Sequence, residues 1–98
     1  MVEIRETAFF TRWMERLDFE VQARILNRIE RLRKGNPGDV RSVGEGVSEL
    51  RIHSGPGYRV YYVQRRGGLI VLLVGGDKSS QRRDIRRALA TAREPEEN

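Results

Sequence analysis

The chain lacks cysteine, contains a single histidine, His53, and has no long apolar segment. Without cysteine, disulfides and thiolate metal sites are excluded, and a reducing compartment suits the chain. One histidine and scattered carboxylates do not form a convergent ligand set, so we expect neither a metal nor another cofactor. The N-terminal residues are interrupted by charges and no run is long enough to span a bilayer, so we expect a cytoplasmic protein without a membrane partner.

Several enzyme motifs are also missing. The glycines at 44–46 and 75–76 do not have the spacing of a Walker or Rossmann phosphate loop. One histidine without a nucleophile elbow makes a serine-hydrolase triad implausible. What remains is phosphate chemistry without a metal. RNA is cleaved by attack of its own 2′-OH on phosphorus when a site provides a proton acceptor, cations and a proton donor.

Arginine dominates the charged residues. Lys34 and Lys78 are the only lysines among nineteen basic residues, and fourteen acidic residues leave a net charge of +5. Arginine binds phosphate or carboxylate through a planar, bidentate fork. Two interpretations stay open for each arginine: it binds an anionic partner, or it belongs to a solvated helix face in an arginine-rich composition.

Length and periodicity predict one domain over residues 1–93, followed by an acidic tail at 94–98 that we expect to be disordered. Residues 2–5 alternate as in a short strand. Thr7 is a suitable N-cap for a helix to about Leu17, and Asp18 is one for a second helix over 19–34. These two helices form a predicted hairpin.

The stretch Glu49–Lys78 predicts three consecutive strands. Glu49–His53 and Tyr58–Gln64 alternate, whereas Leu69–Val74 is apolar on both faces, as expected of a covered central strand. A turn at 54–57 and a two-residue glycine turn at 67–68 join them. We expect Gly75 and Gly76 to end the last strand, and Val40–Gly46 to form either a short edge strand or a loop.

Ser79 or Ser80 can cap a final helix whose inward residues are Ile85, Ala88 and Leu89. The predicted fold is therefore a single α+β domain in the order strand, two helices, three antiparallel strands and a helix. In this arrangement a curved sheet packs on the helical hairpin.

Alternation places the basic side chains of the middle strands on one face. If Leu50, Ile52, Val60 and Tyr62 face the helical hairpin, Arg51, His53 and Arg59 emerge together on the opposite, open face of the sheet. With Lys78 nearby, this cluster is a candidate site for a phosphate chain. Each residue also has a structural alternative: Arg59 pairs with Glu49 or Asp77, Lys78 offsets Asp77, Arg51 lies on a solvated face, and His53 is an exposed residue without a role.

Three segments together resemble the RelE/HigB-like toxins of the RelE/ParE superfamily, in the branch often labelled addiction-module killer proteins. They are Leu50–Ile52, Gly57–Tyr62, and Gly75–Gln81 followed by Asp84, Ile85 and Ala88. The resemblance implies a microbial-ribonuclease-like fold and a toxin that cuts mRNA on the ribosome to inhibit translation.

On this resemblance, the catalytic candidates are Arg59, Arg51, His53 and Lys78. Tyr61, on the same strand face, and Arg82 and Arg83, on the last helix, are candidates for RNA contact, although Tyr61 also suits simple packing beside a helix. His53 suits proton transfer because its ordinary pKa is about 6.5. The chain departs from the family pattern where a C-terminal tyrosine or histidine often occurs, so the general acid and base stay open.

The resemblance also implies partners: a small helix-turn-helix antitoxin, mRNA and the ribosome, with DNA contacted only through the antitoxin. The alternative is a ParE-like toxin without nuclease activity that binds DNA gyrase. The basic set on the sheet favours the nuclease, because such relatives usually lack it.

Overall fold

The computed structural model describes residues 2–94, so the expected tail at 94–98 lies outside the described residues apart from Glu94. The elements in chain order are β1 (Ile4–Glu6), α1 (Ala8–Glu15), α2 (Phe19–Arg33), β2 (Val40–Gly44), β3 (Val47–Ile52), β4 (Tyr58–Gln64), β5 (Ile70–Gly76) and α3 (Gln81–Ala92), with 3-10 turns at Arg66–Gly68 and Lys78–Ser80. The predicted α+β class and element order are confirmed, and β2 is an additional strand. Within residues 2–94, no helix combines the length and apolar character needed to cross a bilayer.

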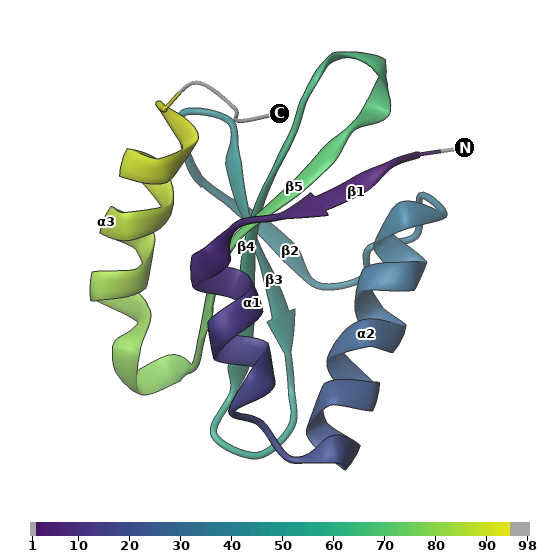
Figure 1. The fold of residues 1–98 in the computed structure, drawn as a ribbon, viewed down its shortest axis with the longest axis vertical. Helices are drawn as coiled ribbons and strands as arrows, with labels where there is room; N and C mark the ends of the chain where they lie inside the picture. Colours follow the sequence, from purple (N-terminus) through teal and green to yellow (C-terminus); the bar gives the residue numbers. More distant parts are fainter. Residues whose placement is uncertain (1, 95–98) are drawn as a thin grey trace.

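One mixed sheet organises the protein. Its strands lie in the order β1-β5-β4-β3-β2, with β1 parallel to β5 and the other pairs antiparallel. The uncertain segment 40–46 is therefore an edge strand for most of its length. In Figure 1 the strands lie between α3 on one side and α2 on the other. The sheet is thus covered on both faces, and the expectation of one open face is wrong for the part beneath α3.

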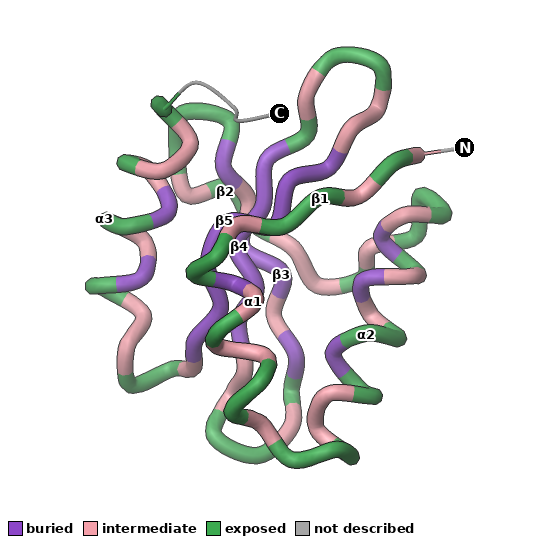
Figure 2. Tube along the Cα trace, in the orientation of Figure 1, coloured by how far each residue is buried: buried purple, intermediate pink, exposed green. Residues whose placement is uncertain are grey.

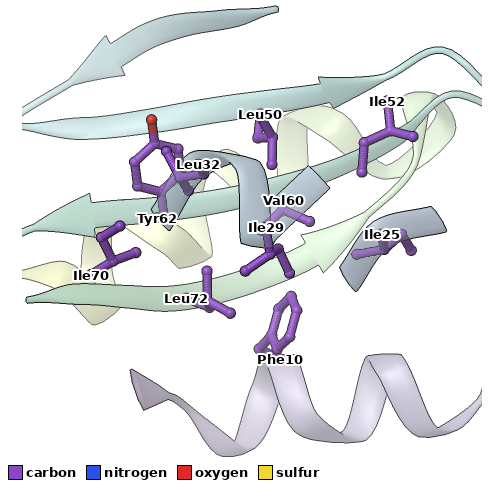
Figure 3. Close-up of a cluster of buried hydrophobic side chains, with 10 residues drawn as sticks. All are labelled: Phe10, Ile25, Ile29, Leu32, Leu50, Ile52, Val60, Tyr62, Ile70 and Leu72. Atoms are coloured by element: carbon purple, nitrogen blue, oxygen red, sulfur yellow. The ribbon is translucent and has the colours of Figure 1, made fainter. Parts of the chain in front are cut away.

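The helical hairpin covers one face and buries the alternating apolar residues that the sequence assigned to it. Thr7 caps α1 by accepting a hydrogen bond from the backbone N–H of Phe10 at 3.2 Å, whereas Asp18 occupies the N-cap position of α2 without a side-chain bond. Figure 3 shows Phe10 and the α2 residues Ile25, Ile29 and Leu32 among the apolar side chains of the strands. The buried residues of this cluster are Phe10, Ile25, Ile29, Leu32, Leu50, Ile52, Val60, Tyr62, Ile70 and Leu72.

Helix α3 covers part of the opposite face. Its buried Ala88 packs on Val47, Tyr61, Val63, Val71, Leu73 and Val74. A bulge at Leu73 in β5 shifts the register between Tyr61 and Tyr62 of β4, so Leu73 and Val74 both serve this second core. Figure 2 shows the buried positions running along the central strands and along the inward sides of the helices.

The last strand runs two residues beyond its predicted end at Val74, because Gly75 and Gly76 are themselves part of β5. Both lie where a helix approaches the strand closely. A Cβ added at Gly75 would lie 2.0 Å from the Trp13 indole of α1, and one at Gly76 would lie 1.8 Å from Oδ2 of Asp84 in α3. These glycines therefore admit the two helices on opposite faces of one strand.

The close packing at Gly75 gives a stability prediction. Gly75→Ala should lower the free energy of unfolding by about 1–3 kcal/mol, because the added methyl group overlaps the indole and forces it to move. Urea unfolding followed by tryptophan fluorescence measures the loss. Adding Trp13→Leu should make the Gly75→Ala change less costly, and an alanine variant as stable as the parent would show that α1 shifts freely.

The glycine turn between β4 and β5 differs from the predicted two-residue hairpin. Residues 66–68 form a three-residue loop in which Gly67 and Gly68 have φ values of +74° and +84°. The N–H of Arg65 donates to the carbonyl of Leu69 at 2.7 Å and closes the loop. The glycines were thus correctly assigned to positive φ, but the loop has one more residue than expected.

Candidate functional site

The strand register brings polar side chains of distant segments into two rows on the α3 face of the sheet. In one row Arg41 of β2, Glu49 of β3 and Tyr61 of β4 are consecutive partners. In the next row Arg51 lies opposite Arg59. The predicted placement of Arg51 and Arg59 on one face is therefore observed, at the end of the sheet where α3 begins.

Glu49 is the buried centre of the first row. Glu49 has 0% exposure. Its Oε1 accepts a hydrogen bond from Nε of Arg41, and its Oε2 accepts bonds from the Tyr61 hydroxyl and Nε2 of Gln81, each at 2.8 Å. Gln81 is the first residue of α3, so this carboxylate ties the edge strand, the sheet and the helix together.

These bonds also set the protonation state of Glu49. Burial, the largest single effect, raises its pKa, but the hydrogen bonds from Arg41, Gln81 and Tyr61 together outweigh burial and place the pKa below its ordinary value. The same burial and the bond to Glu49 raise the pKa of Tyr61 well above its usual range. An ionised, enclosed Glu49 with both oxygens engaged is a structural anchor and does not face solvent as a base.

Arg59 lies deeper than expected. The sequence predicted an exposed strand residue, whereas only 8% of Arg59 is exposed. Among residues 2–94 its guanidinium has no hydrogen-bond or ion-pair partner, and its buried Nε is unsatisfied. Neither pairing considered from the sequence occurs: Glu49 is engaged by other donors, and Asp77 binds the N–H and hydroxyl of Ser79. Alternation gave the face of Arg59 correctly but not its depth.

Asp39 joins two predicted site residues. Its Oδ1 accepts hydrogen bonds from NH2 of Arg51 at 2.9 Å and from Nε at 3.3 Å, and its Oδ2 contacts Nε2 of His53 at 2.5 Å. Hydrogen bonds lower the pKa of Asp39, and the bond from His53 has a larger effect than the bond from Arg51. Asp39 is therefore an ionised acceptor, and Arg51 is paired rather than free on a solvated face.

The Asp39–His53 pair has the geometry that a histidine base requires. The carboxylate holds Nε2, which leaves Nδ1 as the second ring nitrogen, and among the described residues Nδ1 has no hydrogen-bond partner. The His53 side chain is 73% exposed, so a substrate can reach it. A carboxylate in this position orients the imidazole ring.

Lys78 reaches the same end of the sheet from the turn before α3. Its N–H lies 3.4 Å from the carbonyl of Pro56, and its side chain packs 3.4 Å from the position of a Cβ added at Gly57. This contact places Lys78 beside Gly57, which precedes β4 and lies two positions before Arg59 in the chain. Among residues 2–94 its ammonium makes no ion pair, so the alternative in which Lys78 offsets Asp77 receives no support.

The three candidates for RNA contact have different environments. Tyr61 has 0% exposure and donates its hydroxyl proton to Glu49, so its ring is not available for stacking on a base, and the packing alternative describes it. Arg82 and Arg83 are exposed on α3 and line a groove between α1 and α3. They do not lie within the two polar rows of the sheet.

Sequence reasoning missed Asp39, Arg41 and Gln81. Asp39 follows Gly38 at the entrance of an edge strand that the sequence left uncertain, and Arg41 and Gln81 meet Glu49 only through strand pairing and the docking of α3. No motif spacing marks these residues. Among residues 2–94 no group of three His, Cys, Asp or Glu side chains is placed to hold a metal ion.

Comparisons with known proteins relate the fold to one solved structure and the sequence to a phage-derived family. A chain in the crystal structure of the intact E. coli RelBE toxin-antitoxin complex superposes with a TM-score of 0.65 at 10% identity, over 76% of this chain and 94% of that one. The fold is therefore RelE-like. An uncharacterized protein of Haemophilus influenzae is 46% identical over 94 residues, which is 95% of each chain. Residues 12–95 match the family described as phage derived protein Gp49-like (DUF891), and the chain belongs to that Gp49-like family.

Proposed function

We propose that this protein is the toxin of a type II toxin-antitoxin pair and acts as a metal-independent endoribonuclease on mRNA. The observation that carries the proposal is Arg59 at the end of a RelE-like sheet: the residue is 8% exposed, and its buried Nε has no hydrogen-bond partner among residues 2–94. A largely buried cation without a partner is costly, and an anion bound at this position would offset that cost. A scissile phosphate supplies that anion.

In this proposal Arg59, Lys78 and Arg51 have different roles around one phosphate. Arg59 holds the phosphate oxygens and stabilises the charge that develops during attack by the 2′-OH. Lys78, beside the start of β4, neutralises the same group from the turn. Arg51 remains bonded to Asp39 through Nε and NH2, so its main task is to position that carboxylate.

Proton transfer falls to His53 with Asp39. The free Nδ1 of His53 takes the proton of the 2′-OH, the new O–P bond forms a 2′,3′-cyclic phosphate, and the P–O5′ bond breaks. The departing 5′-oxygen then needs a proton, which the imidazolium or water delivers. Asp39 stabilises the imidazolium between the two steps. The reaction changes no oxidation state and therefore needs no electron donor or acceptor.

A direct test uses a short RNA with a single 2′-deoxy substitution at the mapped cleavage position. Cleavage of the all-ribose RNA should proceed in EDTA and leave a 2′,3′-cyclic or 3′-phosphate end, and the substituted RNA should remain intact at that position. Ribosome dependence is tested by adding translating ribosomes to the same reaction. Cleavage of the deoxy substrate would refute the 2′-OH mechanism.

The partner and the target of the toxin also follow from the proposal. The similar chain belongs to a toxin-antitoxin complex, and we expect a small antitoxin to cover the sheet end of this protein. Mapping RNA ends in cells after induction, together with a test for gyrase-linked DNA breaks, separates the nuclease from a gyrase-binding toxin. Intact mRNA with DNA breaks would favour the gyrase alternative.

A further inference from the structure

A groove between α1 and α3 borders the polar rows of the sheet, because Gly76 in its floor is the β5 partner of Arg59. It has a volume of about 580 Å³, and its floor is the end of β5, Val74–Gly76. β1 pairs with β5 only as far as Leu72, so no described strand covers this edge of the floor. The lining side chains include Phe9 and Trp13 of α1, Arg16 at the C-cap of α1, and Arg82, Arg83, Arg86 and Arg87 of α3.

The groove is cationic, and its charge is largely uncompensated. Five arginines face two carboxylates, those of Asp77 and Asp84. Both carboxylates are engaged locally: Asp77 accepts bonds from Ser79, and the buried Asp84 accepts one from Ser80 at 2.5 Å. Arg83 lies 3.6 Å from Asp84. Within residues 2–94, Arg16, Arg82 and Arg86 form no ion pair.

An aromatic platform lies beside these charges. The guanidinium of Arg87 lies over the Phe9 ring, 4.6 Å from its centre, and Phe9 is 41% exposed although it is a large apolar residue. Stacked planes of this kind accept a nucleobase, and neighbouring cations accept its phosphates. Arg82 and Arg86 are one helical turn apart, about 6 Å along the axis, and Arg83 and Arg87 repeat that spacing.

We infer that the α1–α3 groove binds single-stranded RNA beside the cleaved phosphate, as a second contact region for the substrate. The identification of the ligand as RNA rests on the proposed function. The groove itself is suited to binding phosphate charges and stacked bases. The turn Lys78–Ser80 joins the two regions: Lys78 lies against Gly57 at the sheet end, while Ser79 and Ser80 line the groove. An RNA strand that crosses this turn contacts both the sheet end and the groove.

An acidic protein segment is the competing occupant. Carboxylates also pair with arginine, but they make no use of the Phe9–Arg87 stack. The groove walls are mainly arginine, serine and aspartate, and a peptide that anchors itself by apolar side chains finds only Phe9, Trp13 and Val74. The stacked aromatic and the paired arginine spacing therefore favour a nucleic acid strand.

The test measures binding of uncleavable 2′-O-methyl RNA of six and twelve nucleotides by fluorescence anisotropy. Arg82→Gln/Arg86→Gln should weaken binding of the 12-mer about 10–100-fold and lower its logarithmic salt slope by about 1.4, because two phosphate contacts are lost. The 6-mer should lose less. The matched control, Lys34→Gln/Arg66→Gln, removes the same charge at exposed sites elsewhere and should change affinity by less than about twofold.

Phe9→Leu separates stacking from charge, because it keeps the arginines and should still weaken the 12-mer. Equal losses in the groove and control variants would overturn the inference, as would a 12-residue polyglutamate peptide that binds as tightly with the same dependence on Arg82 and Arg86. The assay needs no cleavage. If the wild-type protein cuts no RNA but the groove variants lose affinity for the 12-mer, the proposed function fails and the groove inference stands. If the wild-type protein cuts RNA and the groove variants bind the 12-mer normally, the groove inference fails and the proposed function stands.

Discussion

Replacing Arg59 with methionine should lower the rate of RNA cleavage by about 10²–10³-fold, the usual loss when a preorganised transition-state contact is removed. The same change should leave the free energy of unfolding unchanged or raise it. Arg59 has no hydrogen-bond partner among residues 2–94, so its removal breaks no bond, and an apolar chain of similar length fills the buried site. Cleavage assays and urea unfolding on the same preparation measure both effects.

Arg28 is the matched control, because it is a structural arginine of the same chain. Its NH1 donates to the carbonyl of Arg51 and its NH2 to the carbonyl of Pro37, each at 2.9 Å. Arg28→Met should therefore destabilise the protein by about 1–3 kcal/mol through two unpaired carbonyls. Arg59→Lys should recover little activity, since a point charge does not replace the planar fork. Full activity of a folded Arg59→Met protein would exclude Arg59 from the chemistry.

The local patterns of the sequence were sufficient for most of the fold. Alternation assigned Leu50, Ile52, Val60 and Tyr62 to the hairpin face, and the apolar run of β5 predicted a central strand. Periodicity is a local property, so these assignments need no tertiary information. Strand pairing is not local, and β2 became recognisable only through its partner β3. Gly75 and Gly76 were predicted to break the last strand, because their role depends on two helices that pack against them.

The site was predictable to the same extent. The face of Arg51 and Arg59 follows from strand alternation, but the depth of Arg59 depends on how α3 docks. Asp39 and Gln81 lie 12 and 32 residues away from the side chains they bind. Contacts at such separations leave no spacing signal, which is why the sequence did not predict Asp39 as a partner of Arg51 or Gln81 as a partner of Glu49.

Removing the carboxylate of Glu49 should cause a large loss of stability. Glu49→Ala should lower the free energy of unfolding at pH 7 by about 2–5 kcal/mol, because the buried hydroxyl of Tyr61 and the part-buried amide of Gln81 lose their shared acceptor and Arg41 loses its ion pair. Chemical denaturation measures this loss. The matched control is Glu45→Gln, which removes an exposed ion pair with Arg93. That pair is solvated on both sides, so its loss should cost less than about 1 kcal/mol.

The pH dependence of Glu49→Gln tests why this carboxylate is stabilising. A folded-state pKa below the ordinary value of 4.5 means that folding favours the ionised form, so its contribution is complete above that value and is lost as the pH falls through the folded pKa. The stability difference between wild type and Glu49→Gln should therefore be largest near neutrality and shrink below pH 4.5. Taking the difference removes the common contribution of Asp39 and Asp77, whose pKa values are also lowered. A difference that grows on acidification would mean that burial outweighs the three hydrogen bonds, and that Glu49 enters the folded protein as the neutral acid.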